Sequence, residues 1–124
     1  MALSAKKRAE STVDSELASR ILRNVSIIEA FLFFTGVGQY DGEFASSLSD
    51  FCEKLKTTPL NSIEFHLKRG DFERWIKETL GDEYLANRIG KIDRSIRGEG
   101  LRKTLQAIVK RRLDQLKATT MNRT

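Results

Sequence analysis

Two Gly-Asp pairs, Gly70-Asp71 and Gly81-Asp82, divide the middle of this chain into short segments and limit what it can fold into. Glycine ends a helix readily because it adopts the left-handed conformation without a Cβ clash, and aspartate is a favoured N-cap of the helix that follows. Apolar residues recur at helical spacing before, between and after the two pairs. We therefore predict three short helices, with Asp71 and Asp82 as N-caps. Their apolar faces contain Leu60, Ile63, Leu67, Phe72, Trp75, Ile76, Leu80, Leu85, Ile89 and Ile92.

The first of the three segments also fits a strand, because Ile63, Phe65 and Leu67 alternate with polar residues. Against the strand, Asn61 followed three residues later by Glu64 is typical of a helix start, and we favour the helix. The second segment carries the only tryptophan of the chain, and one indole buries a large apolar area. We predict a core in which Phe72, Trp75 and Ile76 pack against Phe65, Leu80 and Leu85.

The chain before residue 59 predicts two helices around a β-hairpin. Ser11 or Thr12 is the predicted cap of the first helix, and a second is predicted over residues 47–57, before Pro59. Residues 31–34 are apolar on every side and precede a glycine-rich turn, which favours a short buried strand, although length alone does not exclude a helix. Residues 43–45 are the predicted return strand. The helical stripes are Leu17, Ile21, Val25 and Ile28 in the first helix and Leu48, Phe51, Cys52 and Leu55 in the second.

The last helix is predicted at about residues 101–118, after Gly98 and Gly100. Its apolar residues fall on one face of about 140°, and Arg112 lies within that face, so its guanidinium must snorkel to solvent or find an acid. On the opposite side a ridge of lysines repeats every seven residues: Lys103, Lys110 and Lys117. The whole pattern predicts a mainly α fold, a small helical domain of five to six helices over residues 11–118 with one short β-hairpin near residues 31–45. A flexible basic tail, 1–10, and a frayed end, 119–124, are predicted to flank it.

The composition excludes several classes of protein. A chain of 124 residues suits one domain, and its longest apolar run, residues 27–34, contains Glu29 and is far too short to span a membrane. No apolar segment follows the basic residues 6–8, so we predict no signal peptide and a cytoplasmic protein. The single cysteine, Cys52, cannot form an internal disulfide or a cysteine-based metal cluster, and we interpret it as a small core residue.

Positive charge is concentrated in residues 88–117, which hold ten basic and three acidic residues, a net of +7, whereas residues 11–87 have a net of −5. Such a segment can neutralise phosphates and bind DNA or RNA, but basic helix surfaces also serve solubility alone. The segment lacks interleaved aromatic residues, a helix-turn-helix and an RNA-binding signature. The candidate contacts with nucleic acid or another anionic partner are Arg88, Lys91, Arg94, Arg97, Arg102, Lys103, Lys110 and Lys117.

No catalytic, cofactor or metal site is predicted. His66 and Asp71 have the residue types of a base and its orienting carboxylate, but catalysis would also need a nucleophile or a metal, and there is no second histidine. Trp75 has the chemistry of a stacking platform, yet its spacing favours the core. The glycines of residues 36–42 do not have the spacing of a phosphate-binding loop. We therefore interpret these residues as a structural motif: His66, Asp71, Phe72, Trp75 and Asp82.

The motif formed by residues 64–86 resembles that of an uncharacterised domain family found in archaea and some bacteria. The matching residues are Glu64-Phe65-His66, Arg69-Gly70-Asp71-Phe72, Trp75-Ile76, Leu80-Gly81-Asp82 and Leu85-Ala86. The resemblance covers roughly residues 43–117, and it implies no activity, cofactor or partner, because that family has no established function.

The two amphipathic helices at the ends of the chain suggest a function. Each has an apolar face, and a domain this small need not cover both, which predicts a non-enzymatic protein-interaction or regulatory module. The partner is predicted to be another protein or a second copy of the chain. Nucleic-acid binding through residues 88–117 is the alternative, and the sequence indicates no membrane or small-molecule partner.

Overall fold

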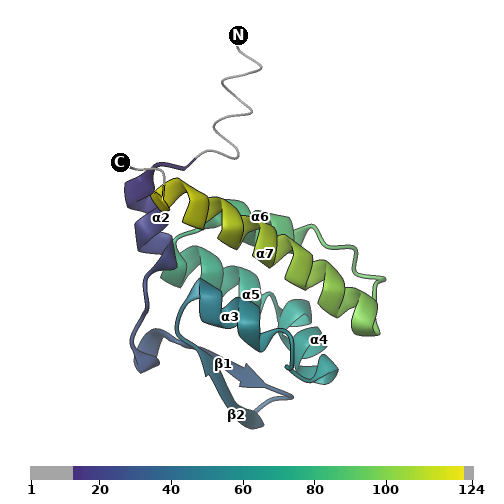
Figure 1. Ribbon diagram of the computed structural model, residues 1–124. Helices are drawn as coiled ribbons and strands as arrows, with labels where there is room; N and C mark the ends of the chain where they lie inside the picture. The colour runs from purple at the N-terminus through teal and green to yellow at the C-terminus, as the bar shows by residue number, and fades with distance from the viewer. Residues whose placement is uncertain (1–12, 122–124) are drawn as a thin grey trace.

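The computed structural model describes residues 13–121, and the fold within that range is mainly helical with one two-stranded sheet (Figure 1). This confirms the predicted fold class. In chain order the elements are α2 (Ser15–Leu22), the 3₁₀ turn η1 (Ile27–Glu29), β1 (Phe31–Phe34), β2 (Tyr40–Ala45), α3 (Leu48–Lys54), α4 (Leu60–Arg69), α5 (Asp71–Arg74), the π-helical segment η2 (Trp75–Leu80), α6 (Glu83–Gly90) and α7 (Gly98–Met121).

The apolar run at residues 31–34 is the strand β1, as predicted. It pairs antiparallel with β2, with Phe31 opposite Ala45 and Leu32 opposite Phe44. Side chains alternate across the sheet, so Phe31 and Phe33 point into the core while Leu32 and Phe44 face outward. A two-stranded sheet therefore leaves half of a fully apolar strand at the surface.

The first helix is shorter than predicted and begins later. Asp14 is its N-cap, because the Asp14 carboxylate accepts the Leu17 N–H at 2.8 Å, and the helix ends at Leu22. The predicted caps Ser11 and Thr12 lie outside the described residues. Ile28, predicted on the same stripe, instead belongs to η1 and is 91% exposed. The stripe is interrupted because the backbone turns extended at Arg23.

The two end helices cover each other. α2 lies against α7, which crosses the upper side of the molecule in Figure 1, and α7 also contacts α6, α3 and α4. Ala18 and Ile21 of α2 are buried, and so are the apolar residues that α7 turns inward. The two apolar faces that suggested an interaction surface are thus largely used within the fold.

The middle of the chain forms short helices, as the Gly-Asp pairs predict. Gly70 and Gly81 both have positive φ, 75° and 87°, and each ends a helical segment in the left-handed region. The segment before Gly70 is the helix α4 and not a strand. Asp82 is the N-cap of α6, because its carboxylate accepts the Leu85 N–H at 3.1 Å.

Two further helices, α3 and α7, have boundaries that differ from the prediction. α3 has Ser47 as its N-cap but ends at Lys54, where the Thr58 hydroxyl donates to the Lys54 carbonyl oxygen at 2.6 Å. α7 starts at Gly98, so the glycines predicted to precede it lie in its first turn. It also continues through residues 119–121, where a frayed end was predicted, because Thr119 still bonds back to the Gln115 carbonyl.

The buried apolar side chains form a single cluster between the hairpin and α7. Phe72, Ile76, Leu80 and Leu85 are fully buried in it, as predicted. Phe65 is the exception, being only partly buried, because it lies off the α4 stripe of Ile63, His66 and Leu67. Cys52 is buried and free, which fits its interpretation as a core residue. No helix in residues 13–121 has the length and hydropathy that a membrane span requires.

Candidate functional site

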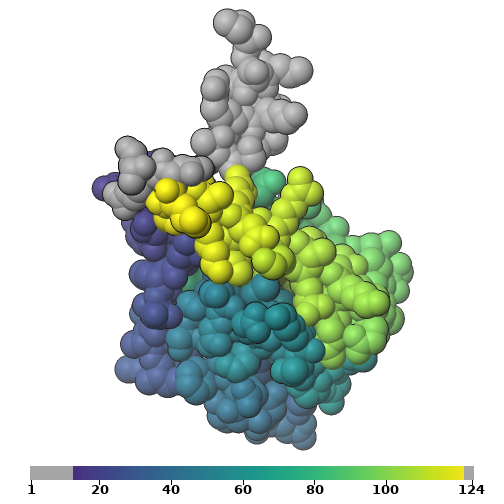
Figure 2. Space-filling model, in the orientation of Figure 1, coloured from purple at the N-terminus to yellow at the C-terminus, as the bar shows by residue number. Residues whose placement is uncertain are grey.

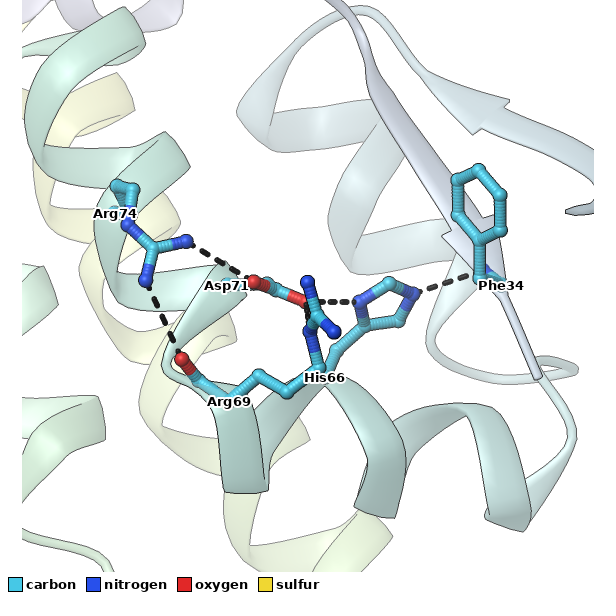
Figure 3. Close-up of polar contacts among 5 residues, drawn as sticks. All are labelled: Phe34, His66, Arg69, Asp71 and Arg74. Atoms are coloured by element: carbon cyan, nitrogen blue, oxygen red, sulfur yellow. Dashed lines mark hydrogen bonds and ion pairs between the residues drawn. The ribbon is translucent and has the colours of Figure 1, made fainter. Parts of the chain in front are cut away.

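His66 is a buried link between α4 and the hairpin (Figure 3). Its Nε2 accepts the backbone N–H of Phe34 at 2.8 Å, and its Nδ1 lies 2.9 Å from the Asp71 carboxylate. A backbone N–H can only donate, so Nε2 must be the unprotonated nitrogen and Nδ1–H must donate to Asp71. Both ring nitrogens are therefore occupied within the fold.

Asp71 is not the N-cap that the sequence predicts. Gly70 occupies the cap position, and Asp71 is the first residue of α5, with no bond from its side chain to the helix N–H groups. Its carboxylate instead accepts bonds from His66, from Arg69 Nε at 3.0 Å and from Arg74 Nη1 at 3.0 Å. The backbone N–H groups at the start of α5, which is a single helical turn, could also have bonded to this carboxylate. The three side-chain donors bond to it in their place, two of them from charged guanidinium groups.

A general base needs a free ring nitrogen within reach of its substrate, and both ring nitrogens of His66 are already bonded. The arrangement is therefore suited to holding α4, α5 and the hairpin together. Burial lowers the pKa of His66 from its ordinary value, although the Asp71 carboxylate opposes that shift. Burial also acts to raise the pKa of the Asp71 carboxyl. The hydrogen bonds from His66, Arg74 and Arg69 together outweigh it and hold that pKa below its ordinary value.

The free energy of unfolding should consequently decrease as the pH falls below 6.5, the ordinary pKa of histidine. The folded state keeps His66 neutral while the unfolded chain takes up a proton, so acid favours unfolding. A second loss of stability should follow below pH 3.8, the ordinary pKa of aspartate. There the unfolded chain protonates Asp71 before the folded state does. Urea unfolding at pH 7.5, 6.5, 5.5 and 4.5 measures the first of these losses.

The control is His66→Gln, which removes the only histidine of the chain. The variant should be less stable at pH 7.5 but should show a much smaller slope between pH 6.5 and 5. An unchanged slope, or an NMR titration that places the pKa of His66 at or above 6.5, would contradict this assignment of the cluster.

Large apolar side chains gather on the outer face of the hairpin. We call this surface the hairpin face and define it by Leu32, Phe34, Val37, Tyr40 and Phe44. Leu32 lies opposite Phe44, and the rings of Phe34 and Tyr40 are 5.6 Å apart. Val37, at the tip, is 83% exposed. Exposed apolar patches of this kind mark interaction sites more often than single exposed residues do.

The hairpin face borders a cavity of about 290 Å³ between β1 and α4. Leu32, Phe34 and Val37 line it from the hairpin, and Phe65 and Arg69 line it from α4. The Arg69 guanidinium lies over the Phe65 ring at 4.9 Å. His66 and Asp71 form part of its wall, so the buried cluster sets the distance between β1 and α4 and with it the width of the cavity.

The candidate basic residues are not all available to a partner. Arg94 donates to the Leu67 carbonyl oxygen at 3.2 Å, and Arg102 donates to that of Leu55 at 2.7 Å, so part of each guanidinium is used within the fold. Arg88 reaches the Tyr84 hydroxyl at 3.3 Å, and Arg97 bonds to carbonyls of its own loop. Exposed side chains remain at Lys91 and, on α7, at Lys103, Lys110 and Lys117, of which Lys110 is paired with Asp114 at 2.8 Å. Figure 2 shows the outer side of α7 (yellow-green) lying open on the face toward the viewer.

The hairpin face was not predicted from the sequence. Residues 31–34 were predicted to be buried on both sides, as strands in the middle of a large sheet are. The short length of the predicted hairpin was the signal that could have revealed the surface, because two strands can bury only one of their faces. The prediction that Arg112 must snorkel or find an acid is confirmed, because its side chain meets Asp82 in the interior, with Nε 2.8 Å from Oδ2.

No curated protein and no solved structure matches the chain. A match to a protein family covers residues 29–124, from the end of η1 onward. This range includes the whole motif of residues 64–86 and extends beyond the part of the chain on which the resemblance rested. The chain belongs to the Family of unknown function (DUF5752).

Proposed function

We propose that this protein is a non-enzymatic interaction module that binds a partner protein through the hairpin face. The observation that carries the proposal is the concentration of exposed large apolar residues. Of the seven such side chains in the described residues, Leu32, Val37, Tyr40 and Phe44 belong to the hairpin face, and Ile27 and Ile28 lie in η1 just before β1. Met121 stands apart at the end of α7.

The cavity beside β1 supports a protein as the occupant. Binding energy at protein interfaces is concentrated where an apolar anchor enters a pocket with a polar rim. Here most of the walls are apolar, and charged side chains of both signs also line the cavity, Arg69 of α4 and Asp71 of α5. A protein segment with an apolar side chain and a charged or polar group beside it fits such a lining.

The support for self-association has changed. The stripes of α2 and α7 that suggested it lie against each other, so they offer little surface to a second copy. The absence of catalysis is inferred from His66, whose two ring nitrogens are both bonded within the fold.

Nucleic-acid binding through residues 88–117 remains the alternative, supported by the aligned Lys103, Lys110 and Lys117. Fewer cations support it than the sequence suggested, because Arg94 and Arg102 bond to the backbone.

Site-specific photo-crosslinking in the source cells tests the proposal. A photoreactive residue at Val37 should give a discrete product with one protein, and the same residue at Met121 should not, although both side chains are highly exposed. With that partner purified, Leu32→Lys should weaken binding at least about tenfold, because it places a charge in an apolar contact. Met121→Lys, the matched control, should leave binding unchanged.

Both variants should retain the melting temperature within a few degrees, since they alter exposed side chains. Sedimentation over a wide concentration range separates a second copy from a different protein. Equal crosslinking from Val37 and Met121, or binding that is insensitive to Leu32→Lys, would contradict the proposal.

A further inference from the structure

A second cavity, of about 540 Å³, lies where α4, the loop at residues 91–97 and the start of α7 meet. Its volume lies in the range of small-molecule sites, about 300–1,000 Å³. Leu67, Ile96 and Leu101 provide apolar walls. Figure 2 shows the corresponding end of α7 at the right of the molecule. The hairpin lies at the lower end in Figure 1, and the two cavities have no lining residue in common.

The charged residues of this cavity are mainly cationic. Lys68, Arg94 and Arg97 line it together with one acid, Glu64, which makes the net charge of the lining +2. Glu64 and Lys68 are four residues apart on α4, a spacing at which such a pair usually forms a salt bridge. Here the Glu64 carboxylate accepts the N–H of Gly98, the first residue of α7, at 3.3 Å. Lys68 is left without a partner among residues 13–121.

The two arginines are oriented before any ligand arrives. Arg94 donates to the carbonyl oxygens of Leu67 at 3.2 Å and Gly90 at 3.4 Å, and it lies 3.8 Å from a Glu73 carboxylate oxygen. Arg97 uses one nitrogen for the carbonyl oxygens of Arg94 and Ile96 and retains its other N–H groups. Side chains held in this way lose little conformational entropy on binding, which favours affinity.

We propose that this cavity binds the phosphate group of a small organic phosphate monoester. A monoester carries a charge of about −1.5 to −2 near pH 7, which matches the lining, and its oxygens accept bonds from several guanidinium and ammonium donors. The apolar walls would receive the organic part. A carboxylate supplies a single charge, and inorganic phosphate supplies nothing for the walls to bind, so both should bind more weakly.

NMR titration of the isotope-labelled full chain with phenyl phosphate, benzoate and inorganic phosphate at low salt tests this proposal. Phenyl phosphate should bind most tightly and should shift the amide signals around residues 64–68 and 94–101. Arg97→Gln and Lys68→Gln should each weaken it about three- to tenfold, as expected for the loss of one partly exposed charge-assisted bond. Lys103→Gln, an exposed cation on the outer side of α7, is the matched control and should have no effect.

Glu64→Gln provides a test of opposite sign. It removes the only negative charge of the lining and keeps an acceptor for the Gly98 N–H, so the affinity for phenyl phosphate should rise. A variant that merely damaged the fold would lower the affinity instead. Val37→Lys should leave phenyl phosphate binding unchanged, so a failure of the hairpin proposal does not affect this one.

Three results would overturn the proposal. Benzoate or inorganic phosphate binding as tightly as phenyl phosphate would show that the cavity does not combine a dianion site with an apolar site. Equal losses from Lys103→Gln and Arg97→Gln would indicate diffuse surface charge. The third result is an oligonucleotide without a terminal phosphate that binds more tightly than phenyl phosphate and loses that binding on substitution of Lys103, Lys110 and Lys117. That result would assign this surface to nucleic acid.

Discussion

Trp75→Ala is expected to lower the free energy of unfolding by about 3–5 kcal/mol, as large-to-small substitutions of buried aromatic residues do. The Trp75 side chain lies in the centre of the aromatic core, with its ring centroid 5.7 Å from those of Phe31 and Phe51. Its indole N–H donates to the Glu29 carbonyl oxygen at 2.8 Å, which ties η1 to the core. Since whole domains are stable by about 5–15 kcal/mol, much of the variant should be unfolded at 37 °C.

Trp75→Phe is the control that separates packing from the hydrogen bond. It keeps an aromatic ring and loses the bond to Glu29, so it should cost less than the alanine variant and mainly loosen η1. Circular dichroism during urea unfolding is the appropriate measurement, because both variants remove the only tryptophan and its fluorescence. A loss below about 1 kcal/mol for Trp75→Ala would mean that the indole is not part of the core.

Arg112→Met is expected to cost a similar amount, about 3–5 kcal/mol, because it would leave a buried carboxylate unpaired. Asp82 is 2% exposed, and two nitrogens of Arg112 meet its two oxygens at 2.8 and 3.0 Å. Arg112 also donates to Gln115 and lies over the Tyr84 ring. The pair joins the start of α6 to the middle of α7, and its loss should separate these helices.

The double variant Arg112→Met with Asp82→Asn should recover part of that loss. Asparagine keeps an oxygen that can accept the Leu85 N–H as an N-cap, and it leaves no buried charge. Urea unfolding of both single variants and the double variant gives the coupling free energy directly. Independent, additive effects of the two substitutions would contradict the pairing of these side chains.

Much of the fold follows from local patterns in the sequence. The left-handed glycines at 70 and 81, the N-cap at Asp82 and the strand at residues 31–34 were all predictable. Each depends on backbone preferences or on the period of apolar residues, which act within a few neighbouring positions. The apolar face of α7 was predictable for the same reason, and so was the need of Arg112 for an acid.

Tertiary structure alone decided which distant groups meet. Asp71 has the sequence context of an N-cap, yet it binds His66, because the turn at Gly70 brings the two side chains together. His66 accepts a bond from Phe34, 32 positions away, and no local pattern specifies such a partner. The hairpin face is exposed because no further strand or helix of residues 13–121 covers it, and the cavity beside Lys68 exists because α4 meets the start of α7. Local sequence determines how each segment folds, whereas the packing of the segments determines which side chains bond to one another and which are left for a ligand or partner.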